Sequence, residues 1–367
     1  MKYYHSIILF ASLWAGMSIT VQGQSNKPEV RKYANEFLKI GVSARAMGMG
    51  NSQVAISDDV TAGYWNPAGL VNVESPEISL MHAAYFANVA NYNHVGFALP
   101  LDSAKTRTFA VNLIRFGVDN IPNTLNLVNN QQINFDNVRD FSVADFAALM
   151  SYAWKIRAVE GLSVGTNFKI IYRGIGKFGN GWGFGLDAAA RYQRKGFMAG
   201  IMVADATNTM TAFTFNTETF QDAFINTGNA VPQNSIELMR PSLNIGLGQK
   251  VNIGNTMRAV FALDGNFSFD GARSAALISG GKMTLDPRLG VELSYLKDNK
   301  PMISLRGGMY NFQKEPDIEK GTVVTMFPTA GVGFGLKRFQ IDYALSNVGG
   351  FSQARYSHII SAKFFLK

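Results

Sequence analysis

The chain has 367 residues, no cysteine, a formal charge of +8 and only 16% charged residues, against about 25% in typical soluble proteins. The absence of cysteine excludes disulfides, thiolate metal sites and a cysteine nucleophile. Lys and Arg are scattered without a basic run, so we expect no nucleic-acid partner.

The first 23 residues have the composition of a secretory signal peptide. Lys2 provides the positive start, residues 7–20 are mostly apolar, and Val21 and Gly23 suit positions −3 and −1 of a signal-peptidase site. The alternative is an uncleaved anchor helix, but the apolar stretch is short for a span of about 20 residues. The sequence therefore predicts an exported chain that is cleaved after Gly23.

The rest of the chain divides into two parts. Residues 24–73 begin with a polar stretch and continue rich in Gly, Ala and Asp, without sustained alternation of polar and apolar side chains. Residues 74–367 are strand-like from Ile78 onward. We expect these two parts to play different structural roles.

Residues 162–173 show the strand pattern clearly, because successive side chains of a β-strand point to opposite faces. One face carries Leu162, Val164, Phe168, Ile170 and Tyr172, and the other carries Ser163, Gly165, Asn167, Lys169 and Arg173. The sequence predicts fourteen such strands, near residues 77–86, 91–101, 106–117, 143–155, 162–173, 181–193, 196–206, 242–251, 257–267, 288–296, 302–310, 330–337, 339–347 and 355–366. A possible further strand at 275–279 leaves the number of strands open by one hairpin.

The connections between these strands are sorted by length. Every second connection is short, at 102–105, 157–161, 194–196, 254–255, 297–300 and 337–338. The long connections alternate with the short ones, so they all lie at the opposite ends of the strands. They are 119–140, 208–241, 267–287 and 311–327. Outer-membrane barrels have short periplasmic turns and long external loops. The pattern predicts an all-β, transmembrane antiparallel β-barrel of about 14 strands, with both termini on the periplasmic side.

The polar faces of the predicted strands carry charges of both signs. These candidate lumen residues are Lys169, Arg173, Asp187, Arg191, Arg258, Asp264, Glu292, Asp342 and Lys363. Buried charges need partners or water. We predict a paired network that holds the lumen rigid, and the alternative is a water-filled pore with individually solvated charges.

Residues 37–70 contain the most specific motif. Its residues are Gly41, Ala44, Arg45, Ala46, Met47, Gly48, Gly50, Val54, Ala55, Asp58, Asp59, Ala62, Tyr64, Trp65, Asn66, Pro67, Ala68 and Leu70. The segment resembles the N-terminal signature of the PorV/PorQ family of Bacteroidetes outer-membrane proteins. Its Asn-Pro-Ala step is similar to the hatch of FadL-type fatty-acid transporters, whose barrels have fourteen strands. The resemblance implies that residues 24–73 form a hatch inside a barrel of residues 74–367.

Individual hatch residues make physical sense in a plug. Gly48 and Gly50 permit close packing and positive φ. Asp58 and Asp59 can accept main-chain hydrogen bonds at a turn or helix start. The Trp65, Asn66 and Pro67 step sets a turn, and Arg45 is a candidate partner for an aspartate in the segment or on the lumen wall. The competing interpretation is that these residues only fold the hatch.

No catalytic or metal-binding pattern is present in the sequence. His82, His94 and His358 stand alone without metal-ligand spacing, and no Ser/His/Asp order stands out. We therefore expect a non-enzyme with no cofactor and no metal.

The resemblance implies an outer-membrane protein of a Gram-negative, Bacteroidetes-like bacterium that serves the type IX secretion system as a non-enzymatic docking component. Its partners would then be outer-membrane lipid, translocon or attachment-complex proteins, and secreted cargo. The candidate contact residues are Phe213, Phe215, Phe220 and Phe224 of the long 208–241 connection. The alternative for these side chains is that they fold over the mouth of the barrel. The alternative is a FadL-like transporter of hydrophobic small molecules, and a third possibility is a structural barrel.

Overall fold

The computed structural model describes residues 34–85, 88–125, 127–129, 132–271, 273, 275–317, 321–348 and 357–366. The predicted signal peptide and residues 24–33 lie outside these described residues. The described residues all belong to one compact unit, Arg31–Lys367.

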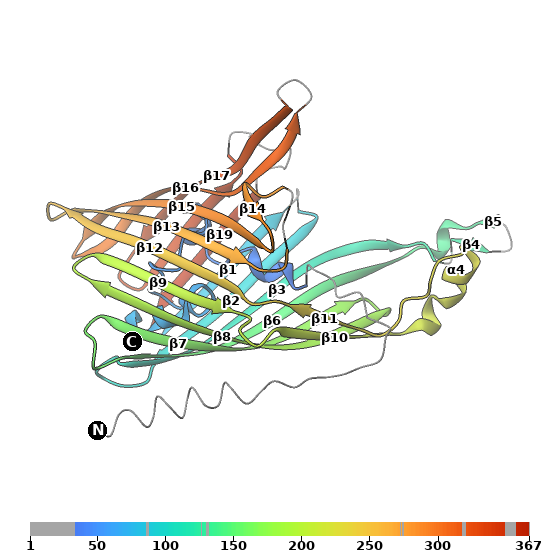
Figure 1. Ribbon diagram of the computed structural model, residues 1–367, viewed down its shortest axis with the longest axis horizontal. Helices are drawn as coiled ribbons and strands as arrows, with labels where there is room; N and C mark the ends of the chain where they lie inside the picture. The colour runs from blue at the N-terminus through green and yellow to red at the C-terminus, as the bar shows by residue number, and fades with distance from the viewer. Residues whose placement is uncertain are drawn as a thin grey trace. The chain divides into compact units, whose positions relative to one another are not determined.

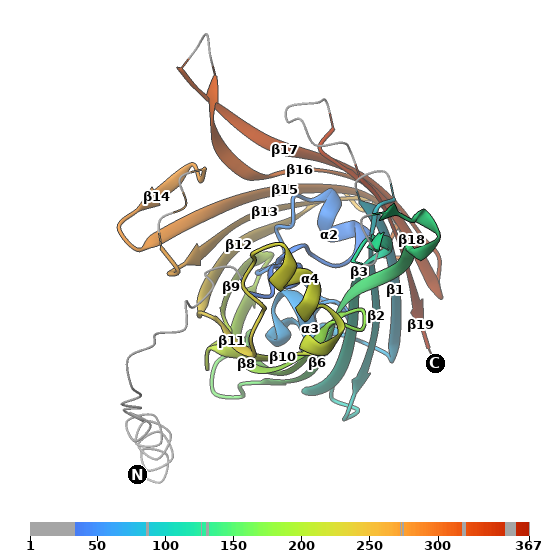
Figure 2. The same ribbon diagram turned by 90° about the vertical axis from the view of Figure 1, so that its right-hand side faces the viewer.

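Most of the described chain forms a single antiparallel sheet that closes on itself (Figures 1 and 2). Strand β1 pairs with β2 on one side and with β19 on the other, which completes the cylinder. The wall strands are β1 Glu77–Tyr85, β2 Ala90–Pro100, β3 Arg107–Asn123, β6 Arg139–Lys155, β7 Leu162–Ile175, β8 Gly179–Arg194, β9 Phe197–Ala204, β10 Thr209–Phe215, β11 Ser235–Met239, β12 Ser242–Ile253, β13 Met257–Ser268, β15 Met283–Lys297, β16 Lys300–Asp317, β17 Gly321–Gly335, β18 Phe339–Ser346 and β19 Ser357–Phe365.

In the described residues the chain runs fourteen times from one end of the barrel to the other, as the sequence predicts. Each such passage is called a crossing here. Strands β9 and β10 both pair with β8 and follow one another along it, so they form one crossing. Strand β11 pairs with β10 while β12 pairs with β9, so these two form the next crossing. The possible extra strand is β14, Ile278–Gly280, which pairs only with the first residues of β15 and adds no crossing.

Small elements occupy the loops at the long-connection end, here called the long-loop end, while the opposite end is the short-turn end. These elements are β4 Val128–Asn129, β5 Gln132–Ile133, η3 Phe135–Asn137, η4 Thr217–Thr219 and α4 Gln221–Asn226. In the described part of the chain, no helix combines the length and the apolar character that crossing a membrane requires.

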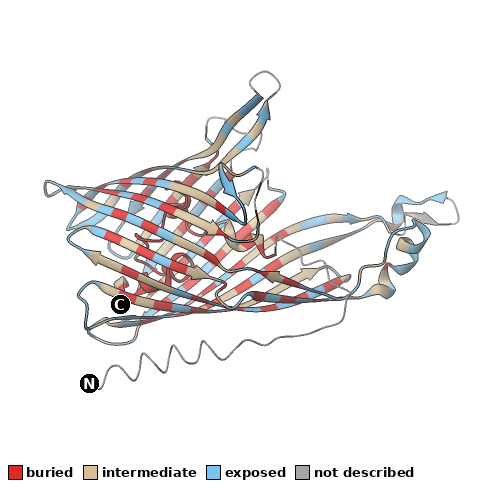
Figure 3. Ribbon diagram, viewed as in Figure 1, coloured by how far each residue is buried: buried red, intermediate tan, exposed pale blue. Residues whose placement is uncertain are grey.

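The two faces of the wall differ as the alternation predicts (Figure 3). On β8, Phe184 and Leu186 point outward and are 54% and 41% exposed, whereas Asp187 on the inner face is 2% exposed. Similar rows of exposed apolar side chains run along the other strands. A wall that is apolar outside and polar inside is the pattern of a barrel set in lipid.

Residues 34–76 fill the bore of the barrel and contain no strand. The segment consists of η1 Glu36–Lys39, α2 Ala44–Gly48, α3 Ala62–Trp65 and η2 Pro67–Asn72, joined by turns, and most of it is buried. Asn35 bonds to Thr211 on β10 near the long-loop end, whereas Glu77 begins β1 at the short-turn end. The described chain therefore crosses the bore from the long-loop end to the short-turn end, where β19 also ends at Phe365. The predicted position of the N-terminus lies outside the described residues.

The hatch main chain lies directly against glycines of the wall. A Cβ atom added to Gly308 on β16 would lie 2.2 Å from the Gly50 nitrogen, and one on Gly290 of β15 would lie 2.4 Å from the Met49 carbonyl oxygen. Both distances are far below van der Waals contact. Glycine at these wall positions therefore allows the hatch backbone to approach.

We expect Gly308→Ala to destabilise the closed barrel by about 1–3 kcal/mol, because the added methyl group overpacks the contact with the hatch. The measurement is the temperature at which the folded band shifts to the unfolded position on a gel. Gly280→Ala is the control, because a Cβ at that position meets nothing within 4 Å. An equal shift for both variants would contradict the proposed contact.

Candidate functional site

Arg45 on α2 joins the hatch to the barrel wall. Its guanidinium donates one hydrogen bond to Asp58 Oδ1 at 2.8 Å. It also donates to both carboxylate oxygens of Glu292 on β15, at 3.0 and 3.1 Å. Arg306 on β16 bonds the same Glu292 at 2.6 Å and Asp342 on β18 at 2.8 Å. One continuous set of charges thus links the hatch with three wall strands, and we call these five residues the Arg45 latch.

A second ion pair fixes the hatch to β19, the strand that pairs with β18 of the latch. Lys363 on β19 donates to Asp59 Oδ2 at 2.7 Å, while Asp59 Oδ1 accepts from the Thr61 main chain at 2.9 Å. Glu77 at the start of β1 accepts from the Val60 nitrogen at 3.1 Å. Asp59 therefore shapes the turn before α3 and ties it to the wall.

Wall charges also bind the main chain of the hatch directly. Asp264 on β13 accepts hydrogen bonds from the nitrogens of Gln53 and Val54 at 2.6 and 2.8 Å. Arg191 on β8 donates to the carbonyl of Ala55 at 2.7 Å. The irregular main chain of the hatch makes few hydrogen bonds within the hatch itself. These wall side chains therefore act as hydrogen-bond partners for its N–H and C=O groups.

Asp58 and Asp59 of the hatch are held as anions. Burial alone would raise the pKa of each, but the nearby cations Arg45 and Lys363 outweigh that effect and lower the pKa of both carboxyls. Neutral pH therefore leaves both aspartates able to hold their cations.

Another ion group lies within the wall itself. Lys169 on β7 bonds Asp187 on β8 at 2.7 Å and also bonds Asp205. The Asp205 nitrogen donates to Asp187 Oδ1 at 2.8 Å. All three side chains are almost completely buried. Nearby, Arg173 pairs with Asp145 at 2.9 Å and with Glu237 at 3.1 Å.

This ion group sits where two neighbouring wall crossings are interrupted. Residues 205–208 separate β9 from β10, and residues 240–241 separate β11 from β12. Asp205 and Asn208 have φ values of 57° and 58°, so the main chain leaves the strand conformation there. In the neighbouring crossing, Pro241 has no N–H to donate to the ladder. We call this place the wall break.

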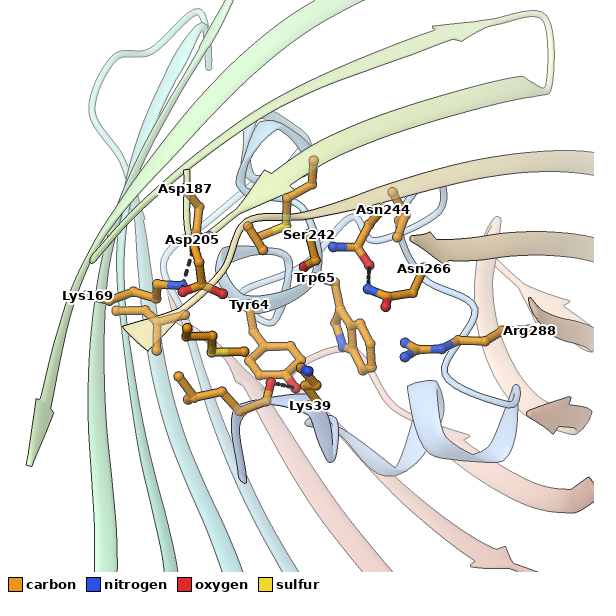
Figure 4. Close-up of a pocket in the computed structure, with 16 residues that line it drawn as sticks. Lys39, Tyr64, Trp65, Lys169, Asp187, Asp205, Ser242, Asn244, Asn266 and Arg288 are labelled. Carbon is orange, nitrogen blue, oxygen red and sulfur yellow. Dashed lines mark hydrogen bonds and ion pairs between the residues drawn. The ribbon is translucent and has the colours of Figure 1, made fainter. Parts of the chain in front are cut away.

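A cavity of about 80 Å³ lies between the hatch and the wall break (Figure 4). Tyr64 and Trp65 of α3 line it from the hatch, and Arg288, Asn244 and Asn266 line it from the wall. Its remaining lining includes flexible apolar side chains and residues that flank the wall break, namely Leu38, Met202, Ala204, Asp205, Met239 and Ser242.

A second, larger space of about 620 Å³ opens at the short-turn end. Arg45, Asp58 and Asp59 line it from the hatch, and Glu292, Arg306 and Lys363 line it from the wall. The hatch therefore separates two spaces of different character, a small mixed cavity and a large charged one.

Eight of the nine predicted lumen charges bond to another charge or to the hatch main chain in the described structure. Arg258 is the exception, because its guanidinium lies at the short-turn end and bonds only to Asn252. Sequence reasoning missed Arg306, Asp145, Asp205 and Glu237. The signal for Arg306 was available, because it alternates with Leu305 inside a predicted strand, whereas Asp205 lies where the strand pattern stops.

The four phenylalanines of the predicted contact loop have different environments. Phe213 is buried on the inner face of β10, with the Arg173 guanidinium 5.3 Å from its ring centre. Phe220 is buried between Phe178 and Phe224. The expectation of a shared external surface is therefore wrong for Phe213 and Phe220, because the local fold covers them. Phe215 and Phe224 are half-buried.

The described histidines form no common site. His94 is buried and bonds Asn112 Oδ1 at 2.8 Å, His82 contacts Asn93, and His358 contacts Tyr343. Among the described residues, no three acidic or histidine side chains gather as metal ligands.

Several solved structures share this fold. The toluene transporter TbuX of Ralstonia pickettii is 14% identical with a TM-score of 0.53, over 89% of this chain and 99% of that one. The monoaromatic hydrocarbon channel CymD is 13% identical with a TM-score of 0.54, over 89% and 98%. The toluene transporter TodX of P. putida is 12% identical with a TM-score of 0.51, over 89% and 99%.

The described chain thus shares the fold of these barrels, and its own antiparallel wall makes fourteen crossings around a filled bore. No protein-family model and no curated protein sequence matches it. The similarity of residues 37–70 to the PorV/PorQ signature stays a prediction.

We expect Arg45→Met to destabilise the hatch by about 3 kcal/mol, because the substitution removes a cation from the buried Glu292 and from the partly buried Asp58. The hatch should become accessible to protease at a lower denaturant concentration. Arg194→Met is the control, because its nearest carboxylate, Glu160, lies 3.9 Å away and both side chains are mostly exposed. Unchanged protease protection in Arg45→Met would show that the latch does not hold the hatch.

Proposed function

We propose that this protein is a non-enzymatic outer-membrane barrel that admits small hydrophobic molecules at the long-loop end and releases them sideways through the wall break. The observation that carries the proposal is the position of the cavity, which directly borders both interrupted crossings. The solved barrels of the same fold include toluene transporters and a monoaromatic hydrocarbon channel.

The hatch favours a sideways route over an axial one. An axial route would have to separate the Arg45 latch, the Lys363–Asp59 pair and the close contacts with wall glycines. At the wall break, by contrast, residues 205–208 lie outside the strands. A molecule leaving there would cross fewer ladder hydrogen bonds than one that separates two continuous strands.

The cavity must enlarge to take an aromatic hydrocarbon. Its volume is about 80 Å³, whereas a dry cavity known to bind benzene measures about 150 Å³. Met202, Met239 and Leu38 line the cavity, and methionine side chains adapt readily because their three side-chain bonds rotate. Ligand entry is therefore coupled to a rearrangement of these side chains.

The wall and the turns support the proposed placement in the outer membrane. Exposed apolar side chains face outward around the barrel, which suits lipid. The short turns then face the periplasm, and the long loops face the outside of the cell. The predicted signal peptide at residues 1–23 supports export, and residues 37–70 support a Bacteroidetes-like origin.

We expect Ala204→Phe to slow toluene uptake about tenfold in a Gram-negative host that expresses the barrel, because the ring fills the cavity beside the wall break. Ala199→Phe on the same strand is the control, because residue 199 lies on the outer face, in register with Leu247. Equal uptake by the two variants, at equal amounts of folded barrel, would overturn the proposed route.

A second candidate function is docking in the type IX secretion system. The observation that favours it is the length of the hairpins at the long-loop end (Figure 1). Strands β16 and β17 remain paired as far as Asp317 and Gly321, although β15 pairs with β16 only to Met309. These hairpins offer partners a surface beyond the membrane, and the firmly bonded hatch suits a barrel that stays closed.

If the protein docks, we expect the double variant Phe215→Ala/Phe224→Ala to lose copurifying secretion-system proteins, because truncating aromatic anchors costs about 2 kcal/mol or more. The control is Phe135→Ala, an exposed aromatic residue of another loop element, η3. Retention of the same partners by the double variant would exclude these side chains as contacts.

A further inference from the structure

The charged space at the short-turn end has no part in the sideways route. It opens beneath the hatch and has a volume of about 620 Å³. The turns that join β12 to β13, β15 to β16 and β17 to β18 form one side of its rim. We call this space the vestibule.

The vestibule carries an excess of cations along that side. Five basic residues of the lining form no salt bridge within the described chain, although Lys250 lies near enough to Asp58 to help lower the pKa of that carboxyl. These residues are Lys250, Arg258, Lys300, Lys337 and Arg338. Most of the carboxylates in the lining are already engaged, because Asp58 and Glu292 bond to Arg45, Asp59 bonds to Lys363, and Glu77 accepts from the main chain of the hatch. Only Glu74 of the lining remains outside such contacts in the described structure.

The spacing of these cations indicates the shape of a ligand. Neighbouring strands lie about 4.8 Å apart, so successive turns on the same rim are separated by about 10 Å. An extended polypeptide advances about 3.3 Å per residue, so carboxylates three residues apart match that separation. A single phosphate or sulfate is too small to reach cations on two turns.

We propose that the vestibule binds an extended, acidic polypeptide segment of a periplasmic protein. A lipid headgroup is a poorer match, because the vestibule opens inside the bore while headgroups surround the outer face of the barrel. The inference rests on the proposed outer-membrane placement, which turns the short-turn end toward the periplasm, and is independent of the molecule that crosses the wall.

Binding there would be coupled to the hatch. Arg45 and Arg306 form part of the vestibule lining and already bind Asp58, Glu292 and Asp342. A ligand carboxylate that reaches this depth competes with those partners for the two guanidinium groups. An acidic segment would therefore loosen the Arg45 latch from the periplasmic side.

The test uses the purified full-length barrel in detergent and a fluorescein-labelled decaglutamate peptide as the probe. We expect saturable binding that weakens about tenfold in Lys337→Glu/Arg338→Glu, because two attractive contacts become repulsive. The matched control, Lys155→Glu/Arg157→Glu, makes the same charge change at the same end of the barrel but outside the vestibule lining. It should weaken binding less than about twofold.

Three results would overturn the proposal. The first is that the barrel shows no saturable binding of the peptide. The second is that both double variants weaken peptide binding equally. The third is that Lys337→Glu/Arg338→Glu loses binding to phosphatidylglycerol vesicles while its affinity for the peptide stays unchanged. If that variant does not fold, Lys337→Gln/Arg338→Gln should still weaken peptide binding more than Lys155→Gln/Arg157→Gln. Toluene uptake should be unaffected by all these variants, so failure here is distinguishable from failure of the proposed route.

Discussion

The contact between Arg45 and Glu292 is the interaction on which the closed state of this barrel depends. The hatch has only short helical segments, so many of its main-chain groups lack partners within the segment itself. Where those groups and the charges around them are buried, they must bond to the wall. Arg45 meets this need because its planar guanidinium binds Asp58 of the hatch and both oxygens of Glu292 at once. Arg306 then extends the same network to Asp342.

The wall is adapted to the hatch in two ways. Where main chain meets main chain, as at Gly308 and Gly290, the wall has no side chain at all. Where a hatch turn exposes its nitrogens, the wall supplies a carboxylate, as Asp264 does for Gln53 and Val54. The polar face of the barrel is therefore a fitted binding surface for residues 34–76 rather than the lining of an open channel.

The two spaces on either side of the hatch have different physical character. The cavity near the long-loop end is small, contains aromatic and methionine side chains, and borders the wall break. The vestibule at the short-turn end is larger and dominated by charge. The first environment is mixed, with charged and amide groups beside its apolar side chains, and the second carries an excess of cations. One hatch thus lies between two spaces of different character, and Arg45, Asp58, Glu292 and Arg306 of the latch line the second.

The alternation of side chains determined much of this structure without any tertiary information. A period of two assigns each residue of a strand to the lipid or the lumen face, and loop lengths separate the two ends, so the fourteen crossings and the inward position of Lys169 or Glu292 follow from local pattern. The pairing of Arg45 with Glu292 does not, because 247 positions separate them and only closure of the cylinder brings β15 to α2. The wall break, the cavity and the burial of Phe213 were likewise decided by tertiary structure. Each depends on how neighbouring strands end and on which side chains cover them, and local periodicity carries no information about either.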